Sequence, residues 1–282
     1  TDASRLEVAM RHLVERHDAL RFSYREEASG WVQENAGPGD SVSCTCTHLS
    51  TMSASEQEAA VAEEAAALNA RVHLATGPLV ALALFTRGVE QGSRVLIAVH
   101  HLVMDAVSCH VLLADLLAAY EQLGRGEAIA LPPGTTAFGH WAQQLVEHAQ
   151  SEALEAEVDY WCAPYWSQTS SLPLDFPEGV NTVDSARQYS ISLGNEETRA
   201  LLQEVPKAYN TQINDVLLTA LAQALTSWTG ESGHNIALEG LGREPILDGV
   251  DLSRTVGWFS TLYPVHLDLA GAVGSAEALK VI

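Results

Sequence analysis

Residues 95–108 read VLIAVHHLVMDAVS, and the interpretation of the whole chain starts from them. The first five residues of this stretch are aliphatic, which predicts a short buried strand. Two histidines, His100 and His101, follow at the end of that strand. Asp105 comes four residues after His101, where the apolar pattern predicts an amphipathic helix to about Tyr120. A rigid strand that delivers polar side chains into a turn is a common way to build an active site.

The two adjacent histidines indicate acid-base chemistry, because histidine is the side chain that exchanges a proton most readily near neutral pH. Successive strand residues point to opposite faces, so at most one of His100 and His101 faces a given cavity. We expect the other to be buried support. Asp105 has a structural alternative as the N-cap of the following helix, and we expect that role for it.

Composition bounds the class of protein. The chain has 282 residues, of which 47% are hydrophobic, enough for a substantial core in one large domain or two lobes. It carries 15 basic and 36 acidic residues, and the resulting net charge of −21 argues against nucleic acid or an anionic membrane surface as a partner. No uninterrupted apolar run approaches the roughly 20 residues that span a bilayer, so we expect no membrane association.

Four cysteines stand at positions 44, 46, 109 and 162. They are too few and too scattered for a disulfide scaffold, which favours a reducing compartment and a cytoplasmic protein. Cys44 and Cys46 share one face of a predicted strand, but no second ligand cluster accompanies them. We therefore expect structural thiols and no metal site.

Periodicity and capping patterns predict an alternation of helices and strands in the first half of the chain. The expected elements are a helix over 4–17 leading into a strand, a hairpin partner at 30–33, an alternating segment at 42–48, a helix from the Ser53 capping box to about 69, a hairpin of strands 79–85 and 94–99, and a long helix from 136 to about 161.

The second half begins with an extended, proline-containing crossover. We place a linker at 167–187, between an N-terminal lobe over 1–166 that carries the histidine motif and the beginning of a C-terminal lobe over 188–282. The expected elements there are a strand at 188–193, a helix from Asn195 to near Pro206, a largely buried helix at 212–228, strands at 235–238 and 262–269, and the start of a helix at 275–282.

Residues 100–108, HHLVMDAVS, resemble the HHxxxDxxS signature of the condensation superfamily of nonribosomal peptide synthetases. Three later stretches, 213–218, 239–244 and 251–264, are similar to the INDVLL, EGHGRE and DLSRTVGWFT-LYP blocks of epimerization domains, in the same order. Residues 16–24 resemble the RHExLR block of the superfamily, in which His17 would be structural support. The resemblance covers nearly all of the chain and favours the epimerization branch.

This resemblance implies an α/β fold of the chloramphenicol-acetyltransferase type, an α+β sandwich with two lobes. The second lobe would be incomplete here, since in the family it continues well beyond the position of residue 282. The implied activity is that of an isomerase, which inverts the α carbon of an aminoacyl or peptidyl thioester. The substrate would be carried on the 4′-phosphopantetheine of a peptidyl carrier protein, with neighbouring synthetase modules as further partners and no directly bound cofactor.

The α proton of a thioester is weakly acidic, so a positioned base must remove it and the enolate must be stabilised. Reprotonation from the opposite face inverts the centre, and two groups on opposite sides are the economical arrangement. The resemblance assigns these roles to His101 and Glu239. They lie 138 residues apart, on different predicted strands and lobes, which would place the reacting carbon in a cleft between the lobes.

Further residues of the blocks receive supporting roles. Arg243 is expected to form a structural ion pair with Asp105, and His100 to support the site. Ser108 lacks the sequence of a nucleophile elbow and is expected to be a helix hydroxyl. The possible substrate-channel residues are Ser108, Asn214, Trp258 and Tyr263.

Three positions depart from the family pattern: Leu241 replaces the histidine of EGHGRE, Ala106 the glycine after the aspartate, and Cys109 an aromatic residue after the serine. Two alternatives to an epimerase therefore stay open. A condensation enzyme would need His101 but not Glu239. A catalytically silent carrier-docking domain is favoured by the loss of a polar side chain at Leu241.

Overall fold

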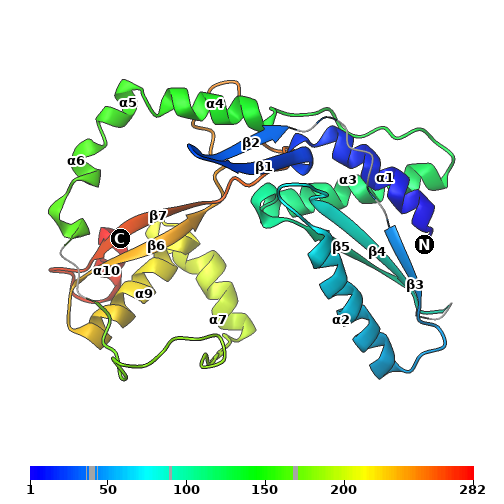
Figure 1. Cartoon of the computed structure of the whole chain (residues 1–282). Coiled ribbons are helices and arrows are strands. Elements are labelled where there is room, and N and C mark those ends of the chain that lie inside the picture. Colours follow the sequence, from blue (N-terminus) through cyan, green and yellow to red (C-terminus); the bar gives the residue numbers. More distant parts are fainter. Residues whose placement is uncertain (36, 38–41, 43, 89–90, 168–170) are drawn as a thin grey trace. The chain divides into compact units, whose positions relative to one another are not determined.

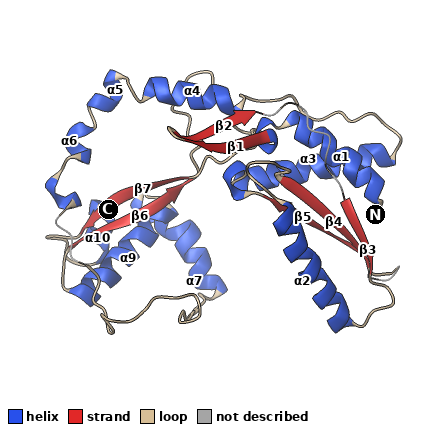
Figure 2. Ribbon diagram, in the orientation of Figure 1, coloured by secondary structure: helices blue, strands red, loops and turns tan. Residues whose placement is uncertain are grey.

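The described part of the chain forms a mixed α/β structure with three small sheets (Figure 1, Figure 2). The computed structural model describes residues 1–35, 37, 42, 44–88, 91–167 and 171–282. The chain divides into two compact units. Unit 1 comprises Thr1–Ser151 and Leu241–Thr261, and unit 2 comprises Glu152–Gly240 and Leu262–Ile282.

The central sheet of unit 1 has the order β3-β4-β5. Its strands are β3 (Cys44–His48), β4 (Val80–Thr86) and β5 (Ser93–Val99). β4 pairs in parallel with β3 and antiparallel with β5, where Val80 faces Val99 and Thr86 faces Ser93. The predicted hairpin that ends at the two histidines is confirmed.

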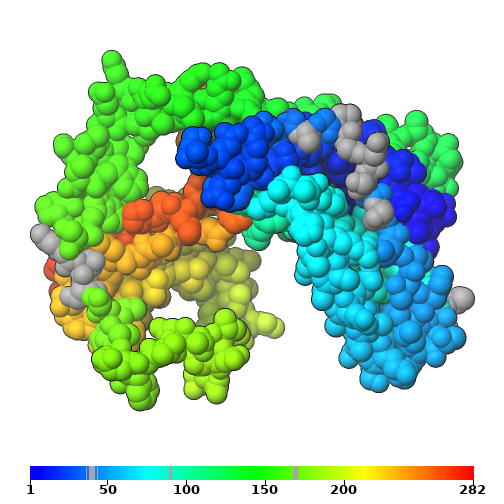
Figure 3. Space-filling view, in the orientation of Figure 1, coloured from blue at the N-terminus to red at the C-terminus, as the bar shows by residue number. Residues whose placement is uncertain are grey.

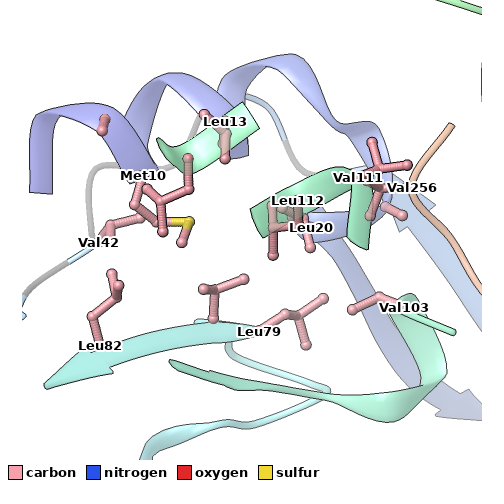
Figure 4. Close-up of a cluster of buried hydrophobic side chains, with 14 of the residues drawn as sticks. Met10, Leu13, Leu20, Val42, Leu79, Leu82, Val103, Val111, Leu112 and Val256 are labelled. Carbon is pink, nitrogen blue, oxygen red and sulfur yellow. The ribbon is translucent and has the colours of Figure 1, made fainter. Parts of the chain in front are cut away.

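β4 is buried on both faces, which explains its continuous apolar sequence. Val80 and Leu82 belong to the main core, together with buried residues of α1 (Ala3–Arg16) and α3 (Ala106–Gly124). Figure 4 shows this core, with Leu82 among its labelled residues. Members of this core include Met10, Leu13, Leu20, Val103, Val111, Leu112 and Val256. The alternate residues Ala81, Ala83 and Phe85 join a second cluster with Leu68 of α2 (Ala54–Arg71).

The remaining elements of unit 1 surround this layered core. They are η1 (Asp18–Arg21), the hairpin of β1 (Phe22–Glu27) and β2 (Gly30–Asn35), the short η2 (His101–Val103) and α4 (Phe138–His148). The predicted capping box at Ser53 opens α2, with the Glu56 side chain reaching back to the Ser53 backbone. Residues 241–261 return to this unit as a loop, which we call the return loop.

Unit 2 contains the long helix α9 (Ile213–Thr229), several shorter helical segments and a two-stranded sheet of β6 (Gly233–Gly240) and β7 (Thr261–Asp268). The shorter helical segments are α5 (Glu152–Glu155), α6 (Val158–Trp161), η3 (Pro164–Trp166), α7 (Asn195–Arg199), η4 (Ala200–Glu204), α8 (Val205–Tyr209) and α10 (Ser275–Val281). The strand predicted at 262–269 is confirmed as β7, which begins and ends one residue earlier. The strand predicted at 235–238 is confirmed as β6, which extends two residues further at each end.

The prediction of one long helix over 136–161 is wrong. Thr136 is held outside the helix, because its amide donates to the Asp251 carbonyl at 2.9 Å and its own carbonyl accepts from the Thr255 hydroxyl at 2.7 Å. The helix therefore begins at Phe138. It ends at His148 in tight turns at Gln150 and Ser151, and only the short α5 and α6 follow.

Two predictions for unit 2 are also wrong. Residues 188–193 form no strand, because no neighbouring strand pairs with them among the residues that the structure describes. The helix predicted at 212–228 is present as α9, but it is not largely buried, since only Thr219 and Ala222 are buried in it. The helix predicted from Asn195 is capped by Gly194, and with η4 and α8 the helical path extends past Pro206 to Tyr209.

The two units meet along the chain at residues other than the predicted linker at 167–187. The lobe division concerns the complete two-lobed fold and stays a prediction. None of the helices in the described part of the chain is both long and apolar enough to cross a bilayer.

Candidate active site

β5 delivers the two histidines to the surface of unit 1. After Val99 the His100 amide donates to the Leu79 carbonyl at 3.0 Å, which keeps the chain against β4 for one more residue. The half-buried His100 ring then accepts from the Leu102 amide through Nδ1 at 3.2 Å, which caps η2. His101 is exposed, and its ring lies 4.3 Å from that of Trp258, tilted by 47°. One histidine thus supports the turn while the other is open to solvent.

Asp105 is the N-cap of α3, as predicted. Its Oδ1 accepts from the Ser108 amide at 2.7 Å, and its Oδ2 accepts from the Phe259 amide at 3.1 Å. The residue is 3% exposed, so these backbone donors and a cationic partner replace the water that its carboxylate loses. The partner is Arg243, whose Nη2 lies 3.2 Å from both carboxylate oxygens. The predicted ion pair is confirmed.

Arg243 also fastens the return loop to α3. Its Nη1 donates to the carbonyls of Leu252 at 2.6 Å and Thr255 at 3.0 Å, and its Nη2 donates to Ser108 Oγ at 2.8 Å. The guanidinium lies 4.0 Å from the centre of the Phe259 ring, a cation–π contact. With its side chain 9% exposed, this arginine forms a buried, multiply bonded ion pair, whose loss is costly.

Ser108 is fully buried and its hydroxyl is fully used. It donates to the Gly257 carbonyl at 2.8 Å and accepts from the Gly257 amide at 3.0 Å as well as from Arg243. This agrees with the prediction of a helix hydroxyl. Of the four possible substrate-channel residues, Ser108 is the one that the structure buries, so it holds the return loop.

A second buried carboxylate, Asp115, ties the return loop to α3 further along the helix. It accepts from His17 Nε2 at 3.2 Å, forms an ion pair with Arg254 and lies 3.7 Å from Arg16 Nε. Burial by itself would raise the pKa of Asp115, but the hydrogen bond from His17 and the charges of Arg254, His17 and Arg16 outweigh it and hold that pKa below its ordinary value. His17 is 6% exposed, as expected for a supporting residue.

The other predicted site residues lie in unit 2. Glu239 is an exposed residue at the end of β6, Asn214 is exposed in the first turn of α9, and Tyr263 is 41% exposed on β7. The structure therefore brings together His101 and the supporting residues in unit 1, and each unit holds one of the two predicted catalytic side chains.

The cysteines are free thiols. Burial, followed by the nearby charges of Glu7 and Cys46, raises the pKa of Cys44 to about 11, which keeps this thiol protonated at neutral pH. Within the described residues no three His, Cys, Asp or Glu side chains are grouped in a way that would hold a metal ion.

A family model described as the condensation domain matches residues 1–282, the whole chain. The chain belongs to the condensation-domain family. Among curated relatives it is 42% identical over 279 residues to one of the linear gramicidin synthase proteins of Brevibacillus parabrevis, covering 99% of this chain and 4% of that protein. It is 40% identical over 271 residues to gramicidin S synthase 1 of Brevibacillus brevis, covering 96% of this chain and 24% of that protein.

Solved structures give the same fold. The chain is similar to the epimerization domain from the third module of tyrocidine synthetase B, with a TM-score of 0.86, 37% identity and coverage of 99% of this chain and 64% of that one. The first condensation domain of the calcium-dependent antibiotic synthetase, at 21% identity and a TM-score of 0.74, shares the fold. The sequence resemblance and the fold class expected from it are confirmed, and the chain spans less than two thirds of these relatives.

The three departures from the family pattern lie at accessible places in this condensation-family chain. Leu241 is 59% exposed directly after β6, Ala106 is exposed at the start of α3, and Cys109 is half-buried one residue after Ser108. None of them interrupts the network of Asp105 and Arg243, so the substitutions leave the support of the site intact.

Sequence reasoning missed Asp115 and the contact of Trp258 with His101. The sequence does contain a sign of Asp115, because this residue interrupts the apolar stripe of α3 between Leu112 and Leu116. A charged residue on a buried face needs a partner. The second joins residues far apart in the chain, and no local pattern predicts it.

Proposed function

We propose that this condensation-family domain of a nonribosomal peptide synthetase inverts the α carbon of an aminoacyl or peptidyl thioester. The observation that carries the proposal is the 37% identity, over nearly the whole chain, to a domain described as an epimerization domain. The condensation domain of the calcium-dependent antibiotic synthetase shares only 21%. The glutamate of the epimerization block is present as Glu239, with its side chain exposed at the end of β6.

In this proposal His101 and Glu239 act on opposite faces of the α carbon. One removes the α proton, and the other delivers a proton to the planar enolate, which inverts the centre without any net gain or loss of atoms. His101 is suited to the task because its ring is exposed, while Asp105 and Arg243 of the same unit are buried and fixed. Which of the two groups takes the proton first follows from the configuration of the substrate.

The substrate in this proposal arrives on the 4′-phosphopantetheine arm of a peptidyl carrier protein, and the domain itself binds no further cofactor. The relatives are synthases of linear gramicidin and gramicidin S. In this proposal the domain works beside a carrier domain and neighbouring synthetase modules. We place the reaction in the cytoplasm, where such synthetases would find their aminoacyl substrates.

The test follows the α proton. A carrier protein loaded with an L-aminoacyl pantetheine is mixed with the purified protein in deuterated water. Deuterium at the α position and the enantiomer ratio of the hydrolysed amino acid are then measured. We expect exchange together with a mixture of L and D forms. Amide formation only when an acceptor is supplied would identify a condensation enzyme instead, and the absence of both would identify a silent docking domain.

Glu239→Gln is the matched test of the glutamate. The amide keeps the shape of the side chain but cannot take a proton, so the inversion rate should fall about 100-fold or more. Glu244→Gln, which changes the other exposed glutamate of the same block, should leave the rate within about twofold. Equal rates in Glu239→Gln and the parent protein would refute the assignment.

A further inference from the structure

The imidazole of His101 depends on one neighbour for its orientation. Within the described residues no hydrogen bond reaches its ring nitrogens, and its ring contact is with the indole of Trp258, at 4.3 Å between centroids. An exposed side chain changes rotamer freely unless something packs against it. The indole is therefore the group that limits where this ring can point.

Trp258 is itself held in place from both sides. The preceding residue, Gly257, accepts from the Asp105 amide at 3.1 Å and exchanges two hydrogen bonds with the Ser108 hydroxyl. The following residue, Phe259, donates its amide to Asp105 Oδ2 at 3.1 Å. The indole Nε1 donates to the carbonyl of Ser260 at 2.8 Å, which fixes the ring on the loop.

Close packing around Gly257 and Phe259, the residues on either side of Trp258, holds this part of the return loop in place. A Cβ atom on Gly257 would lie 2.4 Å from the Phe138 ring, so only glycine fits at this position. The Phe259 ring is 1% exposed and packs edge-on against Phe138 at 5.2 Å and Trp141 at 4.8 Å. The backbone on each side of Trp258 is thus fixed by both hydrogen bonds and close packing.

We propose that Trp258 is a positioning residue for His101. Asp105 and Ser108, which belong to the same sequence motif as His101, orient that histidine indirectly, because they hold the return loop that carries the Trp258 indole. This inference rests on the proposed function, in which His101 moves the α proton. The expectation that Trp258 lines a substrate channel stays a prediction beside this role. The positioning role also gives the spacing of the motif a physical reason, because the capping residues of α3 bind the two peptide units that flank the tryptophan.

Proton transfer at carbon requires the imidazole nitrogen to meet the α proton at a defined distance and angle. Trp258→Leu keeps an apolar side chain but removes the flat partner. We expect the turnover number for α-proton exchange to fall about tenfold or more, while KM changes less than about twofold, since a positioning residue acts on the proton-transfer step. Trp258→Phe keeps an aromatic face and should stay within about threefold of the parent.

The second measurement does not depend on catalysis. In protein labelled with 13C-histidine, the ring resonance of His101, assigned by its loss in His101→Ala, should move in Trp258→Leu as the shielding by the indole disappears. Trp31→Leu, which removes a tryptophan that is 66% exposed on β2, is the control and should change neither measurement. If the Trp258→Leu protein does not fold, Trp258→Met is measured in its place.

The outcomes separate this inference from the proposed function. A parent protein that exchanges no α proton would overturn the proposed function, and the His101 resonance would then decide the orientation by itself. An unmoved resonance in Trp258→Leu, or a turnover number equal to that of the parent, would overturn the positioning role. A moved resonance together with a reduced turnover number and rescue by Trp258→Phe would support it.

Discussion

The two units of the chain use their apolar residues differently. In unit 1 every residue of β4 except the last is buried, and helices pack on both sides of the sheet. In the described part of unit 2 the buried hydrophobic residues are Ala222, Leu267, Ala278 and Leu279. Large apolar side chains of unit 2 lie open instead, on the segment 171–193, drawn in yellow-green in Figure 3. Ile191, for example, is 99% exposed.

This difference bears on the two predicted catalytic side chains. The surroundings of His101 are fixed by buried ion pairs and a dense core within its own unit. Glu239 instead stands on a two-stranded sheet, whose β6 packs against α9. Because burial of apolar surface is the main source of stability, unit 1 should account for most of the free energy of folding. Three substitutions test this contrast.

Breaking the ion pair of unit 1 should have the largest effect. Arg243→Ala leaves the carboxylate of Asp105 buried without its cationic partner, and removes the hydrogen bonds to Leu252 and Thr255. The free energy of unfolding should fall by about 3–5 kcal/mol, measured by urea denaturation followed through tryptophan fluorescence.

The control for this substitution is an exposed ion pair in unit 2. Arg199 lies 3.0 Å from Glu204, with the two side chains 62% and 56% exposed. Arg199→Ala should lower the free energy of unfolding by less than about 1 kcal/mol, because water solvates the glutamate that remains. Similar losses in the two variants would contradict the contrast between the units.

Truncating an apolar residue of unit 1 should cause the next largest loss in the free energy of unfolding. The same truncation in unit 2 should cause almost none. Leu82→Ala removes a fully buried side chain from β4 and leaves a cavity in the main core. The expected cost is about 2–5 kcal/mol. Ile191→Ala removes a similar volume from an exposed position and should change the free energy of unfolding by less than about 0.5 kcal/mol. A large loss in Ile191→Ala would show that this segment is buried in the folded protein.

The same contrast explains how much of the fold the sequence predicts. The hairpin of β4 and β5 and the cap at Asp105 depend on residues close in the chain, and both are predicted. The start of α4 depends on the bonds of Thr136 to the return loop more than a hundred residues away, and it is predicted wrongly. The strand pattern at 188–193 has no partner within the described residues, so the alternation alone does not make a strand.

The candidate site divides in the same way. The resemblance singles out His101, Asp105 and Arg243, and the structure confirms the ion pair of the last two. The roles of His101 and Glu239 stay a proposal. The contact of His101 with Trp258 is a matter of tertiary structure, because it joins the end of β5 to the return loop, and no local pattern of spacing indicates it.

Protonation of Asp115 should have the smallest effect and a defined pH dependence. The pKa of this carboxyl in the folded protein is lower than its ordinary value of 3.8, owing to His17, Arg254 and Arg16, although burial acts in the opposite direction. A lowered folded-state pKa means that the carboxylate stabilises the fold fully above the ordinary value. That contribution is lost as the pH falls below 3.8 and through the lower folded-state pKa.

Asp115→Asn removes this titration. Its unfolding midpoint in urea should therefore change less between about pH 5 and about pH 3 than that of the parent protein, a range that brackets the ordinary carboxyl value. Asp184→Asn, at an exposed position in unit 2, should keep the parent's dependence. An acid response in Asp115→Asn as steep as the parent's would mean that other carboxylates account for it, and that the second anchor of the return loop contributes little to the stability of unit 1.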